Sequence, residues 1–269
     1  MSKTLACVAF ALLTAIVWKP AIAETESNFW MANDRASINV GVFLPTMSTE
    51  VRLSSSTLGL GTRFSLENDL GMDDEPTVPR IEGYYRFTRR HRIDYSLQDL
   101  SRDATTVLQR DIQYGDVIFP AGTQVASNFD LKVLKVSYMY SFFQTRTWDL
   151  GFTAGLYGFD FDGSIVAPAA RLVERDEEFA PFPMVGIRAT YALKPVLFLK
   201  GSFEYFEIDR SDVEAEVTDI WVALEYKTGK KLGIGIGYND FDLDGEDKED
   251  RDEVSLKYDG FMLYAKIAF

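Results

Sequence analysis

The chain has 269 residues, a formal net charge of −13 and an aromatic share of 14%. Such an acidic chain is a poor candidate for nucleic-acid binding, which needs a cationic surface. After residue 23 no segment approaches about 18 consecutive apolar residues, so helices that span a membrane are excluded. The same composition allows a membrane β-barrel, because only every second residue of a barrel strand has to face lipid.

The first 23 residues have the pattern of a secretory signal peptide. Lys3 supplies a basic region, an apolar run follows over 5–18, and 21–23 is a small-x-small cleavage site. The alternative, a retained anchor helix, is less favoured because the apolar run is too short to span a bilayer. Cleavage would remove two lysines and Cys7, the only cysteine, so the net charge would become −15. We therefore predict an exported chain with one domain over 24–269 and no disulfide chemistry.

Most of the remaining chain alternates apolar and polar residues with the period of two that is typical of β-strands. In residues 80–87, for example, Ile81 and Glu82 begin two sets of opposite character that continue at intervals of two. Segment 46–66 is ambiguous, because it could add a hairpin, so eight or twelve strands are alternatives to our count of ten. The ten predicted strands lie at 36–45, 80–87, 93–98, 134–142, 148–157, 183–191, 197–205, 219–226, 232–239 and 254–269.

The last predicted strand changes parity along its length. Leu256 and Tyr258 belong to one set of alternate residues, whereas Phe261 and Leu263 belong to the other. An extra residue in one strand of a pair would shift the alternation by one position. We therefore predict a β-bulge at Gly260.

The connections between the predicted strands fall into two groups. Short basic connections lie at 88–92, 144–147, 193–195 and 228–231, whereas long connections with acidic clusters lie at 46–79, 103–127, 162–181 and 240–253. Short turns on one rim and long loops on the other are typical of outer-membrane barrels. A secreted soluble β domain is the alternative, but it would rarely keep a charged face opposite an aromatic-aliphatic face through so many strands. The barrel prediction requires an outer ring of apolar residues that includes Leu134, Val136, Leu197 and Ile234.

The alternating strands, the unequal connections and the final residues Tyr264-Ala-Lys-Ile-Ala-Phe269 resemble the small outer-membrane β-barrel proteins of Gram-negative bacteria, of the OmpA-like or OmpW-like kind. The resemblance implies an all-β, closed antiparallel transmembrane barrel in the bacterial outer membrane. It also implies contact with outer-membrane lipid and lipopolysaccharide, and with the barrel-assembly and periplasmic chaperone machinery. In this class Tyr264, Ile267 and Phe269 would serve as the assembly signal. The oligomeric state stays open.

The charged face of the predicted strands would line the interior of such a barrel. A barrel of about eight to ten strands is narrow enough for side chains to fill, and buried opposite charges would pair. We therefore favour a plugged barrel, with a structural or surface-interaction role through its acidic loops, over a narrow passive channel for small solutes. Gly233, Gly235 and Gly237 either make room for Trp221 and Tyr264 or mark a water path. The predicted lumen-lining residues are Glu82, Arg86, Asp94, Lys135, Arg188, Lys200, Glu204, Asp219, Glu225 and Lys266.

Specific metal or catalytic chemistry has weak support in the sequence. Asp240, Asp242 and Asp244 match the first half of a calcium loop, but Arg251 stands where that pattern needs glutamate. We favour a solvated hairpin tip, with loosely bound divalent cations as the alternative and no cofactor. His91 is the only histidine and lies in a short turn far from the long-loop rim, so we do not expect a Ser-His hydrolase or any other enzyme.

Overall fold

The computed structural model describes residues 34–55 and 58–269, so the predicted signal peptide lies outside the described residues. Within the described part, no helix is long and apolar enough to cross a membrane. The strands are β1 (Ala36–Arg52), β2 (Phe64–Ser65), β3 (Val78–Arg86), β4 (His91–Val107), β5 (Ile112–Tyr114), β6 (Val117–Phe119), β7 (Gln124–Gln144), β8 (Trp148–Ala167), β9 (Leu172–Lys194), β10 (Leu197–Asp209), β11 (Val213–Lys227), β12 (Leu232–Asp247) and β13 (Asp252–Ala268).

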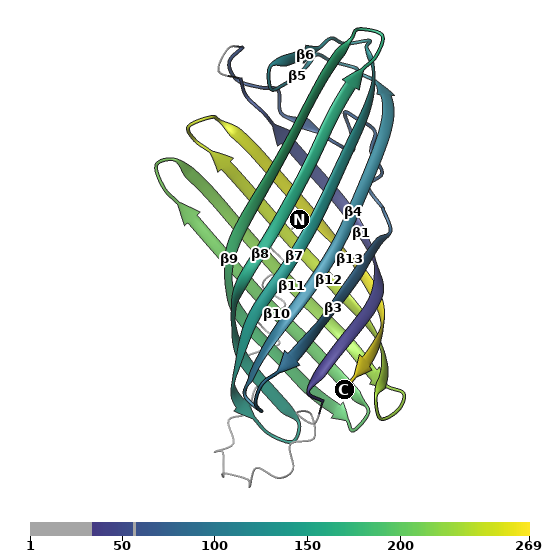
Figure 1. The fold of residues 1–269 in the computed structure, drawn as a ribbon, viewed down its shortest axis with the longest axis vertical. Coiled ribbons are helices and arrows are strands. Elements are labelled where there is room, and N and C mark those ends of the chain that lie inside the picture. The colour runs from purple at the N-terminus through teal and green to yellow at the C-terminus, as the bar shows by residue number, and fades with distance from the viewer. Residues whose placement is uncertain (1–33, 56–57) are drawn as a thin grey trace.

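Ten long antiparallel strands form a closed barrel (Figure 1). The sheet runs in the order β13-β12-β11-β10-β9-β8-β7-β4-β3-β1, and β1 then pairs with β13 from Ser37↔Ala268 to Arg52↔Glu253. Closure removes the free edges that would otherwise leave backbone groups unpaired in lipid. The predicted class, a closed antiparallel barrel with ten wall strands, is confirmed.

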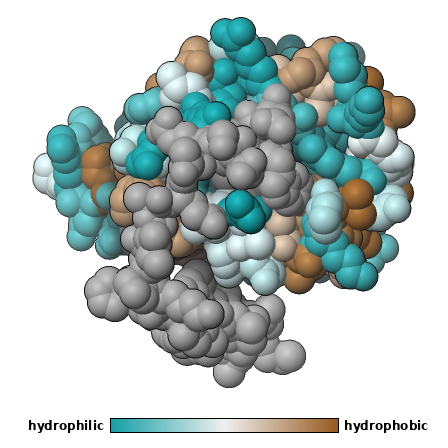
Figure 2. All heavy atoms as spheres, turned by 90° about the horizontal axis from the view of Figure 1, so that it is seen from below, coloured by the Kyte–Doolittle hydropathy of each residue, from teal (hydrophilic) through white to brown (hydrophobic). Residues whose placement is uncertain are grey.

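Apolar side chains form a belt around the outside of the wall. Leu134 and Ile234 are 52% and 55% exposed, Val136 is exposed and Leu197 is half-buried, so the predicted outer ring is not covered by a second protein layer. Hydrophobic side chains are also seen at the outer edge when the molecule is viewed from below (Figure 2). Further exposed members of the belt are Ile38, Val40, Val42, Leu44, Ile81, Leu97, Leu156, Val185, Phe203, Val222, Ile236, Phe261 and Leu263.

The apolar face of the wall changes sides along the barrel axis. On β12, Ile236 points outward and Asn239 is buried inside, but further along Phe241 and Leu243 are buried inside and Asp242 points outward. We call the part with an apolar outer face the lower section (232–239 on β12) and the part with an apolar inner face the upper section (240–247 on β12). Because alternate residues face opposite sides, one continuous strand serves both sections. The apolar outer face of the lower section therefore suits lipid. The upper section has a polar outer face and an apolar interior, as a water-soluble barrel does.

The predicted bulge at Gly260 is wrong. Gly260 pairs with Pro45 on β1 and with Asn239 on β12, and neither register shifts along β13. Tyr258 is buried inside, whereas Phe261 points outward. The change in sequence parity therefore comes from the reversal between the two sections, and the strand itself stays regular.

Two of the predicted long loops are also wrong. The segment predicted as a loop at 162–181 belongs to β8 and β9, which meet at a turn over 168–171. The segment at 240–253 belongs to β12 and β13, which meet at 248–251. Both segments therefore lie on extended hairpins. On β12 the acidic residues within 240–244 face outward and alternate with buried apolar residues, whereas on β9 Asp176 and Glu178 lie on the inner face.

Two segments cap part of the upper end. Residues 58–77 contain β2, which pairs with β1 through Glu50↔Ser65 and Val51↔Phe64, so the ambiguous segment 46–66 adds only this two-residue strand beside β1. The second segment carries the β5–β6 hairpin. Arg102 on β4 ties the cap to the wall, because its guanidinium lies 2.6 Å from Glu67 and donates to Thr49 Oγ1 at 3.0 Å. Apolar residues of these segments that are buried include Leu66, Leu70, Met72, Leu108, Ile112 and Phe119.

Candidate functional sites inside the barrel

The ten residues predicted to line the lumen all lie on the inner wall of the lower section. Lys135 on β7 reaches across the interior to Glu204 on β10 and to Asp219 on β11, with 3.2 Å from Nζ to the Asp219 carboxylate. Tyr157 on β8 donates to both carboxylates, at 2.8 Å for Glu204. These contacts join four strands through one buried ion cluster.

A second ion cluster surrounds Glu225 on β11. Its carboxylate pairs with Lys200 on β10 and with Lys266 on β13, at 3.0 Å for Lys266. Tyr264 also donates to Glu225, at 3.2 Å. The glutamate is almost fully buried, so three donors compensate for the water that it has lost.

A third group of charges centres on Asp94 of β4. Arg92 lies 2.9 Å and Arg188 lies 3.4 Å from its carboxylate. The two remaining predicted lumen residues also have partners, since Glu82 lies 3.3 Å from Arg80 and Arg86 lies 3.6 Å from Asp149. The cavity among these charged side chains is only about 60 Å³ in volume, so the side chains themselves occupy most of the lower lumen.

Sequence reasoning missed several members of this network. Arg80 donates to the Asn239 side chain at 2.8 Å, and Asn239 donates to Asp219 at 2.6 Å. Arg80 has the same strand parity as Glu82 and Arg86, so the alternation could have identified it. Nothing in the sequence indicates the two carboxylate partners of Tyr157.

The glycine stripe of β12 makes room for aromatic side chains. A Cβ on Gly235 would lie 2.2 Å from the Tyr264 ring, and one on Gly237 would lie 3.3 Å from Trp221 Nε1. Of the two alternatives from sequence, space for Tyr264 and Trp221 is therefore the one found. Ring atoms occupy the space that a water path would need at Gly235.

An aromatic layer crosses the lumen above the charged network. Phe159 on β8 lies 5.6 Å from Phe241 on β12, measured between ring centroids, although these strands are not neighbours in the wall. Phe241 then stacks on Tyr258 at 4.7 Å, and Tyr258 meets Phe43 on β1 edge-on at 5.5 Å. Phe159 and Phe241 are 0% and 1% exposed, so aromatic rings fill the lumen between these strands.

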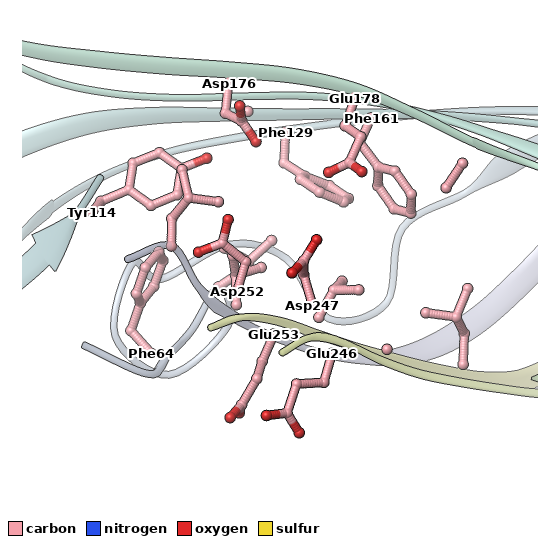
Figure 3. Close-up of a pocket in the computed structure, with 18 of the residues that line it drawn as sticks. Phe64, Tyr114, Phe129, Phe161, Asp176, Glu178, Glu246, Asp247, Asp252 and Glu253 are labelled. Carbon is pink, nitrogen blue, oxygen red and sulfur yellow. The ribbon is translucent and has the colours of Figure 1, made fainter. Parts of the chain in front are cut away.

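The upper section contains a larger, mainly apolar cavity of about 380 Å³ (Figure 3). Phe129 and Phe161 lie on its walls, and Phe64 and Tyr114 contribute from the cap. We call this cavity the upper pocket. Four carboxylates point into it from opposite sides, Asp176 and Glu178 from β9 and Asp247 and Asp252 from the β12–β13 hairpin, whereas Glu246 and Glu253 point away (Figure 3).

The carboxylates of the upper pocket lack cationic partners among the described residues that line it, because these include no lysine or arginine. Partial burial raises the pKa of Asp176, and the charge of Asp252 raises it further. Burial also raises the pKa of Glu178, with added repulsion from Asp176 and Asp252. The pKa of Asp252 is raised by burial and by Asp250 and Asp247, against a hydrogen bond from the Ser54 backbone that lowers it. The pocket is thus an apolar space in which burial and mutual repulsion disfavour the charges of Asp176, Glu178 and Asp252.

The remaining predicted sites lie apart from this pocket. Asp240, Asp242 and Asp244 lie on the strand β12 and not in a loop, and Lys257 on β13 pairs with Asp242 at 2.8 Å and with Asp244 at 3.0 Å. In the described ranges, no three or more His, Cys, Asp or Glu side chains are grouped so that they could hold a metal ion.

The other two predicted features lie toward the lower end of the barrel. The His91 ring contacts Tyr138 and Tyr140 there. Of the proposed assembly residues, Tyr264 points inward, whereas Ile267 and Phe269 are exposed.

The closed antiparallel wall, the apolar outer belt and the polar lower lumen define a protein of the outer-membrane β-barrel class. No protein-family model matches the chain, and a comparison with curated protein sequences gave no significant match. Among solved structures, the outer membrane protease OmpT from Escherichia coli is similar over 91% of this chain and 100% of its own chain, with a TM-score of 0.55 and 9% sequence identity. At that identity the similarity shows a shared fold and nothing more.

Two further solved structures are less similar. The transport unit of the autotransporter AIDA-I from Escherichia coli has a TM-score of 0.44 and 6% identity, and the match covers 98% of this chain and 97% of that chain. The translocator domain of the autotransporter NalP from Neisseria meningitidis has a TM-score of 0.43 and 8% identity, with 98% and 96% covered. These scores carry no conclusion about function.

Proposed function

We propose that this protein is an integral outer-membrane barrel with a closed interior, which holds its upper section at the cell surface for a structural or surface-interaction role. The aromatic layer that joins Phe159 to Phe241 across the lumen is the observation that carries this proposal. It lies in series with the paired charges of the lower section, so a solute would have to disrupt both. The alternative, a narrow passive channel, lacks a comparable supporting feature.

The orientation and partners form part of the same proposal. The chain end at Phe269 lies at the lower end, opposite the two cap segments, and in this class that end faces the periplasm. The upper section, with an acidic outer face that includes Asp130, Asp160 and Asp242, would then stand outside the cell near lipopolysaccharide. We propose export through the signal peptide, assembly by the barrel-assembly and chaperone machinery, and no enzymatic role.

Conductance in a planar bilayer tests the closed interior. We expect the refolded protein to give no steady single-channel steps, because water and ions cannot pass the aromatic layer. An open porin refolded and inserted by the same procedure is the positive control. Steady steps that scale with salt concentration would contradict the closed barrel and favour the channel.

A further inference from the structure

The backbone pairing of the upper section has an opening between β9 and β10. The two strands pair from Leu197↔Lys194 only as far as Tyr205↔Val185, whereas β9 continues to Leu172 and, among the described strands, pairs there with β8 alone. The hairpins β10–β11 and β12–β13 lean away from β8–β9 (Figure 1). We call this opening the slot. It begins near the upper limit of the apolar belt, since Val185 belongs to that belt.

Two prolines explain why the wall does not close above this level. Pro181 and Pro183 lie on the part of β9 that β10 does not pair with. Proline has no backbone N–H and is tolerated in sheets on an edge that needs no donor. Because the two residues share one parity, both missing donors fall on the same side of the strand. Both residues keep their register with β8, so the unpaired side faces the slot.

The slot leads to the upper pocket. The lining of the pocket includes Asp176 and residues 178–182 of β9 and residues 213–215 of β11, which lie on the two sides of the slot. Phe182 and Phe206 meet at its foot, with 5.9 Å between ring centroids, and separate it from the wall below. The pocket therefore borders the slot on the side of the barrel.

We propose that the upper pocket binds a cationic amphiphile, a molecule with an apolar body and one ammonium head, which enters through the slot. This goes beyond the proposed barrel function. The apolar walls, with Phe129 and Phe161 among them, suit the body, and a cavity of about 380 Å³ is in the range that holds small ligands. The head would lie among Asp176, Glu178 and Asp252, where the carboxylates have no cation of their own.

The chemistry of the pocket favours cationic amphiphiles over anionic amphiphiles and over small cations. An anionic amphiphile would bring a like charge next to four carboxylates and would be repelled. A small cation without an apolar body would leave the aromatic walls exposed to water and gain only weak, screened ion pairs. A cation beside Phe161 also gains from the ring quadrupole, whereas the Phe129 ring already has the Arg102 guanidinium 5.1 Å from its centroid. Only a ligand with both an apolar body and a cationic head matches both the apolar walls and the carboxylates of the pocket.

Calorimetric titration tests the proposal with the folded protein in phosphatidylcholine nanodiscs. The probes are decyltrimethylammonium, decyl sulfate and tetramethylammonium, each below its micelle concentration, and empty nanodiscs correct for partitioning into lipid. We expect saturable binding of decyltrimethylammonium alone. Equal binding of decyl sulfate, or no heat beyond that of empty nanodiscs, would overturn the proposal.

Charge-neutralising variants locate the site. Glu178→Gln with Asp252→Asn removes two inward carboxylates and should weaken binding about tenfold or more. The matched control, Glu177→Gln with Glu246→Gln, removes two acidic residues that lie beside them but outside the inward set, and should stay within about twofold. Heat-modified gel mobility verifies that each variant is folded. Equal losses in both pairs would mean non-specific attraction and would overturn the site.

A pocket-filling variant and the pH dependence give independent measurements. Ala180→Phe places a ring in the pocket and should abolish binding without any change in charge. Lower pH should weaken binding, because protonation through the raised pKa values of Asp176, Glu178 and Asp252 removes the charges that hold the head. The other charged groups that shift these three pKa values are all acidic: Glu177, Asp247 and Asp250. Failure of these tests leaves the closed barrel intact, since conductance examines it separately.

Discussion

Replacing Lys135 with methionine is expected to destabilise the barrel by about 3–5 kcal/mol, the cost of leaving buried charge without its partner. Lys135 is the cation that Glu204 and Asp219 share, and all three side chains are less than a tenth exposed. Methionine keeps the length of the side chain, so the loss reflects charge more than volume. Urea unfolding in phospholipid vesicles, followed by tryptophan fluorescence, measures the free energy of unfolding.

The control for this substitution lies on the same strand. Lys132 points outward from β7 and is exposed, so Lys132→Met should change the free energy of unfolding by no more than about 0.5 kcal/mol. Adding Glu204→Gln to the Lys135→Met variant should recover part of the stability, because it removes one of the two carboxylate charges that have lost their lysine partner. Equal effects at Lys132 and Lys135 would show that the buried cluster does not depend on its lysine.

The lower section could be predicted from the sequence because lipid outside and paired charge inside impose one simple alternation. Ile81 faces out and Glu82 faces in, and that alternation was enough to predict the ten wall strands. The ten residues predicted to line the lumen have their side chains on the inner face. The pairing partners could not be predicted, because they depend on which strands face one another across the lumen. Lys135 and Asp219, for example, are 84 residues apart.

The upper section was misread because its environment reverses while its period stays the same. In Asp240-Phe241-Asp242-Leu243-Asp244 the carboxylates face water and the apolar side chains face the interior. The density of acidic residues indicated a loop, although the alternation itself was that of a strand. A rule that allowed the apolar face to change sides would have extended β12 and β13 correctly and removed the bulge at Gly260.

The upper pocket could not have been predicted from local pattern. It exists because β9 and β10 stop pairing above Val185 and Tyr205, and register between strands is a property of the folded barrel. Pro181 and Pro183 were visible in the sequence, but both fell within or beside a segment taken for a loop. Once β9 is known to include both prolines, their position on an unpaired strand edge explains why they are tolerated there.

The aromatic layer should be the most sensitive apolar part of the molecule. Phe159 is fully buried and contacts Phe161, Phe182 and Phe241, so Phe159→Ala would leave a cavity that rigid strands cannot close. We expect a loss of about 3–5 kcal/mol in the free energy of unfolding, from lost burial and from the cavity together. The same urea titration measures it.

Phe179→Ala is the matched control, because Phe179 lies on the neighbouring strand β9 but points outward and is 64% exposed. Its truncation should cost no more than about 1 kcal/mol. A large loss at Phe159 with a small one at Phe179 would mean that the upper section has an apolar core of its own, which the lower section lacks. If both losses were small, the interior above the charged network would be hydrated, and the closed barrel would lose its main support.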